Sequence, residues 1–184
     1  MPRQSDCDRT RRFAHRFVLF FAFGAFGSAW AAGEDRLPAV WNTQELTFSY
    51  VGFTSRYSCD GLRDKVEQAL ITLGARRDLI VTPYPCAGLG KPEPFPRVQI
   101  KVSTLKPAAE AGADGTVEAH WKTVSLAGID KLRPGDCELA EQIRREILPL
   151  FTTRNVKMRT DCVPHQEPAG SIALTVDVLV PATD

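Results

Sequence analysis

The sequence predicts an α+β domain made of two β-α-β-β halves in tandem, on the strength of two observations. Residues 59–86 and 137–162 each open with a cysteine and an acidic residue, continue through helix-like and strand-like segments, and close on a second cysteine. The flanking segments alternate apolar and polar residues, as strands do, in the same order in both halves. We therefore expect an internal duplication, with repeats over about 45–106 and 116–181 and with helices packed on one or two mixed sheets.

Both predicted helices carry the same apolar face. Counted from the opening cysteine, apolar residues recur at offsets 3, 10, 11 and 14, the spacing of one face of an α-helix. These residues are Leu62, Ala69, Leu70 and Leu73 in the first helix and Ala140, Ile147, Leu148 and Phe151 in the second. We expect the first helix over 60–73, with Ser58 as its N-cap and Gly74 as its stop. The second should begin after the N-cap Asp136 and end near 148–151, because Pro149 cannot lie deep inside a helix.

The remaining segments read as strands and loops. Polar residues at 32–42 predict a loosely held lead-in, and an Ala- and Gly-rich linker should join the halves at 107–115. Loops are expected over 87–96 and 163–170. Strands are expected over 46–53, 79–82 and 97–105 in the first half and over 117–126, 155–161 and 172–180 in the second.

The position of the cysteines predicts a disulfide within each half. In a strand-helix-strand unit the two strands run parallel, so the helix begins at the same end of the sheet at which the second strand finishes. Cys59 and Cys137 open helices, whereas Cys86 and Cys162 follow strands. Cα separations of about 5.5 Å are therefore achievable for the pairs Cys59–Cys86 and Cys137–Cys162.

The first 31 residues have the pattern of a cleaved signal peptide. Five arginines precede an apolar run at 17–26, and Ala29 and Ala31 stand where signal peptidase reads small residues. The apolar run is shorter than the roughly 20 residues that span a bilayer. We expect a mature chain over 32–184 that forms a single domain, has no membrane span and is periplasmic or secreted. Its four cysteines, an even number in an exported chain, favour two disulfides.

Composition and motifs disfavour several function classes. The mature chain has 18 basic and 20 acidic residues, a net charge of −2, which gives no electrostatic support to nucleic-acid binding. The sequence has no G-x-S-x-G, H-E-x-x-H or glycine-rich phosphate loop, and all four cysteines of the mature chain look paired. We therefore expect no cofactor and no metal centre, and we favour a non-enzymatic protein. The alternatives are a small extracytoplasmic hydrolase with a site built from scattered residues such as Asp60, His120 and His165, and a metal-binding protein that uses His165 with carboxylates.

Two segments carry a resemblance to other proteins. Residues 54–62, TSRYSCDGL, and residues 159–165, RTDCVPH, resemble segments of an uncharacterised family of exported bacterial proteins with a duplicated, disulfide-stapled half. The resemblance covers most of the mature chain. It implies an exported protein and brings no function with it.

The function expected is that of an exported, non-enzymatic binding or interaction protein for an unknown protein or a small polar ligand. In open sheets, binding sites collect beyond the carboxyl ends of the strands, which here is also the disulfide end. The candidate ligand-binding residues at that end, with Glu93 beside them, are Arg56, Tyr57, Asp60, Tyr84, Asp161, His165 and Glu167. Replacing Tyr57 or His165 with alanine should then weaken binding and leave the melting temperature nearly unchanged.

Overall fold

The computed structural model describes residues 36–53, 55–85, 90–111, 115–128, 131–160 and 172–182. The predicted signal peptide, Cys86, Cys162 and the 163–170 loop lie outside the described residues. The elements of the first half are β1 (Leu37–Ser49), α1 (Cys59–Thr72), β2 (Ile80–Pro83) and β3 (Arg97–Pro107), followed by the short α2 (Ala108–Ala111). Those of the second half are β4 (Val117–Ser125), α3 (Cys137–Gln142), β5 (Thr153–Thr160) and β6 (Ile172–Pro181). The expected α+β class is confirmed.

The six strands form one sheet in the order β2-β3-β1-β4-β6-β5, and every neighbouring pair is antiparallel. The expectation of a mixed sheet was therefore wrong. β1 and β2 do run in the same direction, since both pair antiparallel with β3, but β3 lies between them. β6 separates β4 from β5 in the same way. In each half, the last strand (β3 or β6) therefore lies between the two strands that were expected to be parallel neighbours.

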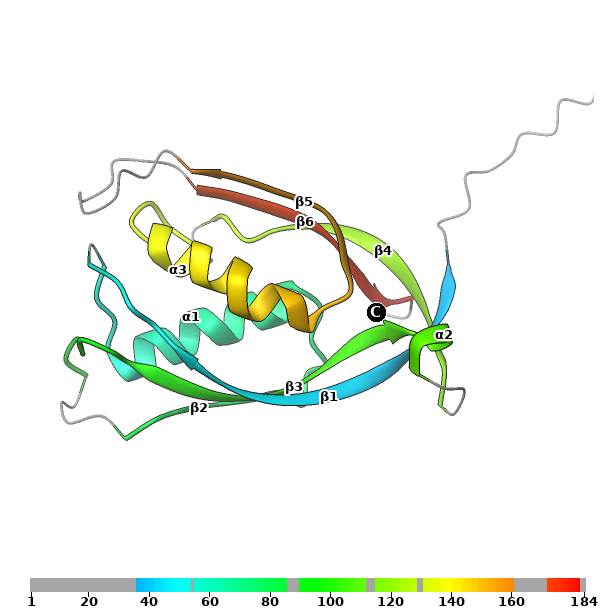
Figure 1. Ribbon diagram of the computed structural model, residues 1–184, viewed down its shortest axis with the longest axis horizontal. Coiled ribbons are helices and arrows are strands. Elements are labelled where there is room, and N and C mark those ends of the chain that lie inside the picture. The colour runs from blue at the N-terminus through cyan, green and yellow to red at the C-terminus, as the bar shows by residue number, and fades with distance from the viewer. Residues whose placement is uncertain are drawn as a thin grey trace, which may run out of the picture. The chain divides into compact units, whose positions relative to one another are not determined.

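The sheet bends around the two long helical segments. In Figure 1, β1, β2 and β3 pass below α1 and α3, whereas β4, β5 and β6 pass above them. The halves are joined by only three paired positions, Leu37 to Ala39 opposite Ala119 to Val117. A short junction between two three-stranded arms allows the arms to diverge and enclose the helices.

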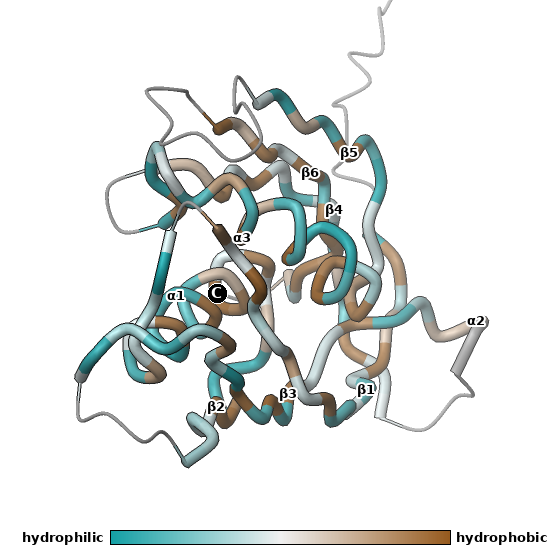
Figure 2. The backbone as a smooth tube through the Cα atoms, turned by 60° about the vertical axis from the view of Figure 1, so that its left-hand side comes forward, coloured by the Kyte–Doolittle hydropathy of each residue, from teal (hydrophilic) through white to brown (hydrophobic). Residues whose placement is uncertain are grey.

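The main core fills the space between the arms. All eight apolar positions predicted for the two helix faces are buried in this core, and so are the alternating apolar residues of β3 and β6. Figure 2 shows the hydropathy of each residue along these strands and helices. A second, smaller cluster of Ala39, Leu105, Ala119 and Leu179 uses odd-numbered strand positions, whereas the main core uses even-numbered ones. Because side chains alternate along a strand, the second cluster lies on the opposite face of the sheet.

Helix α1 begins and ends as expected. The Ser58 side chain accepts a hydrogen bond from the Gly61 N–H at 3.1 Å and caps the first turn. At the other end, the Gly74 N–H donates to Ile71 and the Ala75 N–H to Leu70, both at 3.0 Å, which completes a Schellman motif. Gly74 has φ +86°, and a Cβ at this position would lie 2.6 Å from Val180 Cγ1. Both the backbone conformation and the close approach to β6 therefore require glycine.

Several element boundaries differ from the prediction. β1 starts at Leu37, because the supposed lead-in pairs with β4 over Leu37–Ala39 and with β3 from Ala39 onward, and Leu37 and Trp41 pack against the second cluster. β1 also ends earlier than expected, at Ser49. α3 continues beyond Gln142 as a π-helical turn over Ile143–Ile147 and a 3-10 turn over Leu148–Leu150, which accommodates Pro149 at the end of the helical segment. Part of the expected linker is helical, as α2.

Candidate functional site

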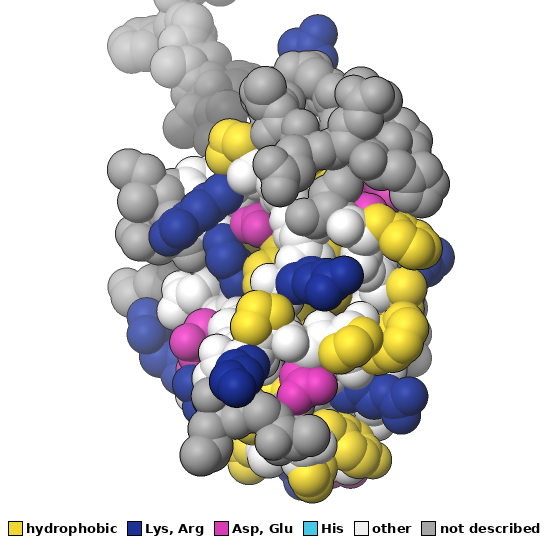
Figure 3. All heavy atoms as spheres, turned by 90° about the vertical axis from the view of Figure 1, so that its left-hand side faces the viewer, with side chains coloured by type: hydrophobic (Ala, Val, Ile, Leu, Met, Phe, Trp, Pro, Cys, Tyr) yellow, Lys and Arg dark blue, Asp and Glu magenta, His cyan; other side chains and the backbone are white. Residues whose placement is uncertain are grey.

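The predicted site lies at the end of the sheet where α1 and α3 begin, which we call the loop end. β1 finishes there at Ser49, residues 50–58 lead into α1, and β2 finishes nearby at Pro83. Figure 3 views this end directly: apolar side chains lie beside lysines, arginines and a few carboxylates. The topology therefore brings the carboxyl ends of β1 and β2 together with both helix starts, as the sequence predicted.

Residues 50–53 are held in place by the start of α3. The Gln142 amide accepts from the Val51 N–H at 3.0 Å and donates to the Val51 carbonyl at 2.7 Å. Glu138 Oε2 accepts from the Phe53 N–H at 2.9 Å and from the Tyr50 hydroxyl at 3.3 Å. Each bond joins residues more than 80 positions apart, so this segment of the first half depends on the second half for its conformation.

Gly52 fits the same arrangement because a side chain has no room there. A Cβ on Gly52 would lie 1.8 Å from the Tyr50 hydroxyl oxygen and 2.7 Å from Glu138 Oε2. The single Tyr50 hydroxyl proton faces two acceptors, the Ser55 carbonyl at 2.9 Å and the more distant Glu138 Oε2. The turn that presents Val51 and Phe53 is therefore packed against a buried tyrosine.

Asp136 is the hub of a buried polar cluster beneath this turn. Its Oδ2 accepts from Lys65 Nζ at 2.9 Å and from the Arg133 N–H at 2.8 Å, and its Oδ1 accepts from the Tyr57 hydroxyl. Lys65 also donates to the Lys131 carbonyl. Asp136 was expected to cap α3 with its side chain; it stands at the N-cap position, but the carboxylate makes no capping bond and instead joins the starts of α1 and α3.

Two tyrosine rings complete the cluster. Tyr50 and Tyr57 meet edge to face, with ring centroids 4.8 Å apart and an interplanar angle of 77°. Burial, together with the neighbouring carboxylates Glu138 and Asp136, raises the pKa of Tyr50 well above its usual value. Burial and the hydrogen bond to Asp136 raise the pKa of Tyr57 in the same direction. Both phenols stay protonated and act as hydrogen-bond donors within the fold.

This geometry corrects the role expected for Tyr57. The sequence placed Tyr57 among the ligand-binding residues and predicted that its removal would spare stability. Its hydroxyl is engaged by Asp136 and its ring by Tyr50, so truncation would leave a buried carboxylate without one of its donors. These contacts give Tyr57 a part in holding the loop end together, and we expect its truncation to lower the melting temperature; its role in ligand binding stays a prediction.

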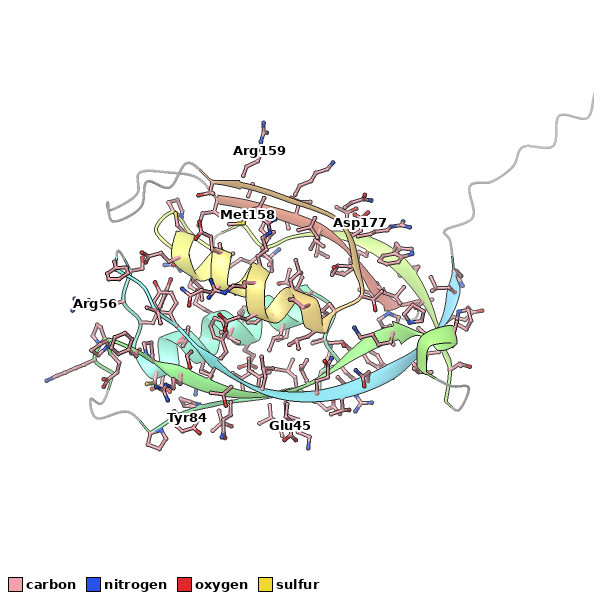
Figure 4. The ribbon with its side chains drawn as sticks, viewed as in Figure 1. Glu45, Arg56, Tyr84, Met158, Arg159 and Asp177 are labelled. Carbon is pink, nitrogen blue, oxygen red and sulfur yellow. The ribbon has the colours of Figure 1, made fainter. Side chains whose placement is uncertain are left out.

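Some of the other residues predicted to bind a ligand are exposed, some form contacts, and some lie outside the described residues. Arg56 and Tyr84 are exposed and point outward at the loop end in Figure 4. Asp60 is exposed and forms an ion pair with Arg63 at 3.4 Å. The Glu93 N–H donates to the Tyr57 carbonyl at 3.0 Å. Asp161, His165 and Glu167 lie outside the described residues.

Four exposed apolar side chains lie at the loop end. Phe53 is 70% exposed, Phe95 62%, Val51 47% and Tyr84 41%. Only Tyr84 was predicted. The signal for the others was present in the sequence, since Phe53 follows a glycine and Phe95 stands between two prolines, where an aromatic residue has no strand or helix to bury it.

The described residues of the alternative hydrolase site, Asp60 and His120, do not lie close together. Asp60 lies at the start of α1, whereas His120 pairs across the sheet with Val180, the residue that Gly74 approaches at the other end of α1. A helix of 14 residues separates these ends by about 20 Å. In the part of the chain that the structure describes, no three His, Cys, Asp or Glu side chains gather to hold a metal ion.

Among the described residues, no helix has the length and apolar character needed to cross a membrane. No protein-family model, no curated protein and no solved structure matches this chain.

Proposed function

We propose that this chain is an exported, non-enzymatic interaction protein that recognises a protein partner through the loop end. The observation that carries this proposal is the exposure of Phe53, Phe95, Val51 and Tyr84 at one end of the sheet. The backbone of Val51 and Phe53 is fixed by hydrogen bonds to Gln142 and Glu138 of α3. Exposed aromatic rings are characteristic of the centres of protein interfaces. A fixed conformation reduces the ordering cost of binding.

The rim of this surface adds charge to the apolar centre. Arg56 projects from the same segment as Phe53, and Asp60 and Arg63 lie on the first turn of α1. An apolar centre with a charged rim suits a protein partner better than a small polar ligand, which would need several convergent polar groups.

The proposed export has support from the cysteines. Cys59 and Cys137 are both buried, and each is the first residue of a helix. We propose that their partners are Cys86 and Cys162, one bond in each half. Disulfides persist in oxidising compartments such as the periplasm or the cell exterior, to which the signal-like leader would direct the chain.

The proposed duplication has support from the sheet and from two side-chain pairs. The strand order β2-β3-β1-β4-β6-β5 reads as one half followed by its mirrored counterpart. The Arg76 guanidinium lies 5.5 Å from the Trp41 ring, and the Arg154 guanidinium lies 4.3 Å from the Trp121 ring. Each arginine stands 17 residues after the cysteine that opens its helix, Cys59 or Cys137. The tryptophans stand in the first strand of each half, 18 residues before Cys59 and 16 before Cys137. A duplicated unit that has since diverged would retain such a pair in each half.

The experiment is a quantitative pull-down from the periplasmic fraction with three immobilised proteins: wild type, Phe53→Ser/Phe95→Ser and Ile71→Ser. Ile71 is also an exposed apolar residue but lies near the other end of α1, so it serves as the matched control. A partner should be enriched on wild type and on the control and lost on the double variant. Equal recovery of every captured protein on all three would refute recognition through the loop end.

A further inference from the structure

β5 is an edge strand of the sheet that the described strands form. The strand order places it at the end of the sheet, and β6 is its only neighbour among the described strands. β2, at the other edge, has four residues and ends in a proline, whereas β5 has eight. An exposed strand edge presents N–H and C=O groups on which an extended chain can pair.

The regular part of β5 is short and lies toward the loop end. Asn155 has φ +53° and the register shifts between Arg154 and Lys157, so the strand carries a bulge there. From Lys157 onward, the strand pairs with β6 without interruption. The bulge therefore confines any added strand to the residues that follow it.

A groove runs beside this stretch, between α3 with its π-helical turn and β5. It has a volume of about 460 Å³ and is lined by Glu141, Arg144, Arg145, Met158 and Thr160. Met158 points from β5 toward the helix, whereas Arg159 points away from it (Figure 4). Arg144 Nη1 lies 3.8 Å from Met158 Sδ. Alternate side chains of an added strand would meet the groove on one side and open sheet on the other.

The charge around this edge is predominantly positive. Arg144, Lys157 and Arg159 are exposed, and no described carboxylate forms an ion pair with them. Arg145 forms an ion pair with Glu146 at 2.6 Å. Arg154 forms an ion pair with Asp177 and a cation–π contact with the Trp121 ring. A second copy of β5 would bring the same cations against these, so like-charge repulsion disfavours a β5–β5 dimer.

We propose that the β5 edge and the adjoining groove bind an extended peptide segment rich in acidic residues, by strand addition. Backbone hydrogen bonds to β5 would supply sequence-independent affinity, and carboxylates would pair with Lys157 and Arg159 on the open side and with Arg144 at the groove. The bulge and the basic side chains, which protect the edge against self-association, also select for a short acidic partner. This binding surface is separate from the loop-end side chains Phe53 and Phe95.

The test uses a fluorescein-labelled peptide of eight alternating Glu and Val residues, with blocked ends, and measures its binding by fluorescence anisotropy at about 0.15 M salt. The protein variants are Lys157→Glu/Arg159→Glu and the control Arg77→Glu/Arg97→Glu. The control makes the same change in net charge at exposed positions of the first half. Wild type and control should bind alike, whereas the β5 variant should bind at least about ten-fold more weakly.

Two further comparisons isolate strand addition from simple charge attraction. The same peptide N-methylated at every residue should fail to bind, because neither of its two alternating sets of amides can then donate to a strand. Hydrogen exchange within 157–160 should slow when the unmodified peptide is bound. Equal binding of the N-methylated peptide, equal weakening by the control variant, or no binding to wild type at about 1 mM peptide would overturn the proposal.

Two further variants serve as controls, one for misfolding and one for binding at the loop end. If the charge-reversed β5 variant does not melt cooperatively, Lys157→Gln/Arg159→Gln replaces it, with Arg77→Gln/Arg97→Gln as control. Phe53→Ser/Phe95→Ser should bind the acidic peptide as wild type does. Loss of peptide binding in that variant would place the peptide at the loop end and refute the β5 site.

Discussion

At the scale of single residues, Asp136 connects the starts of the two main helices. Its carboxylate is buried and receives bonds from Tyr57 and Lys65 in the first half and from the Arg133 backbone in the second. A buried carboxylate is costly unless it is paired and hydrogen-bonded, and here three donors satisfy it. The same bonds fix residues that lie directly beneath the exposed aromatic side chains of the loop end.

A double-mutant cycle on Asp136 and Lys65 should reveal this coupling. Asp136→Asn leaves the largely buried Lys65 ammonium without its counter-charge and should lower the free energy of unfolding by about 3 kcal/mol. Lys65→Met leaves Asp136 with its other donors and should cost about 1 to 2 kcal/mol. The double variant, measured by urea denaturation, should be more stable than the sum of the two losses implies. Strict additivity would mean that the pair contributes nothing to stability.

Tyr57 should make the protein sensitive to alkali. Because the fold raises the pKa of Tyr57 above its unfolded value near 10, the unfolded chain loses this proton first as pH rises. The stabilisation is complete below pH 10 and is lost above it, by about 1.4 kcal/mol per pH unit for one phenol. Tyr57→Phe should therefore flatten the decline in unfolding free energy between pH 10 and 12.

The control for this measurement is Tyr84→Phe, which removes a hydroxyl from an exposed side chain. Urea denaturation at a series of pH values gives the slope for each variant. An identical alkaline slope in wild type and Tyr57→Phe would contradict the buried position of this phenol.

At the scale of elements, each helix depends on one buried apolar face. Leu70 and Leu148 occupy equivalent offsets from Cys59 and Cys137, and both are buried in the main core. Leu70→Asp and Leu148→Asp should each cost about 3 to 5 kcal/mol, because each buries a carboxylate without a partner. Ile71→Asp changes the adjacent, exposed position and should shift the thermal melt only slightly. Melts of both leucine variants close to wild type would show that these faces do not hold the core.

Elements were predictable where the signal was local. The helix faces, the Ser58 cap, the Gly74 stop and the alternating residues of β3 and β6 follow from periods of 3.6 and 2 and from capping chemistry. The start of β1 was missed because its polar middle, from Asn42 to Glu45, is a strand only through its pairing with β3. The placement of β3 between β1 and β2 is likewise set by non-local pairing, which sequence periodicity does not encode.

The loop end was predictable in position but not in detail. The end of the sheet followed from strand and helix directions, and Arg56 and Tyr84 are exposed there. The role of Tyr57 was hidden because its partner Asp136 lies 79 residues away in sequence. The exposed Phe53 and Phe95 stand in turns, where hydrophobic periodicity gives no guidance.

At the scale of the whole molecule, the halves are joined by few strand contacts and by many side-chain contacts. The β1–β4 junction pairs three positions, while Gln142, Glu138 and Asp136 reach from the second half into the first. The end of the second helical segment does the same at the other side, where Gln44 and Thr104 donate to the Leu150 carbonyl at 3.1 and 2.7 Å. The halves are therefore expected to unfold together rather than one at a time.

Within each half, a disulfide is expected to fix the start of the helix to the segment that follows the second strand. The predicted pairs are Cys59–Cys86 and Cys137–Cys162, and each should stabilise the protein by roughly 3 kcal/mol through the loop that it closes in the unfolded chain. Proteolysis without reduction, followed by mass spectrometry, should yield one crosslinked peptide from each half. Removing one pair, as in Cys59→Ala/Cys86→Ala, should lower the stability of the whole protein in a single transition, because the halves share one core. A peptide joining Cys59 to Cys137, or a thiol in the mature chain that reacts at high occupancy, would contradict the pairing, and two separate transitions would contradict the shared core.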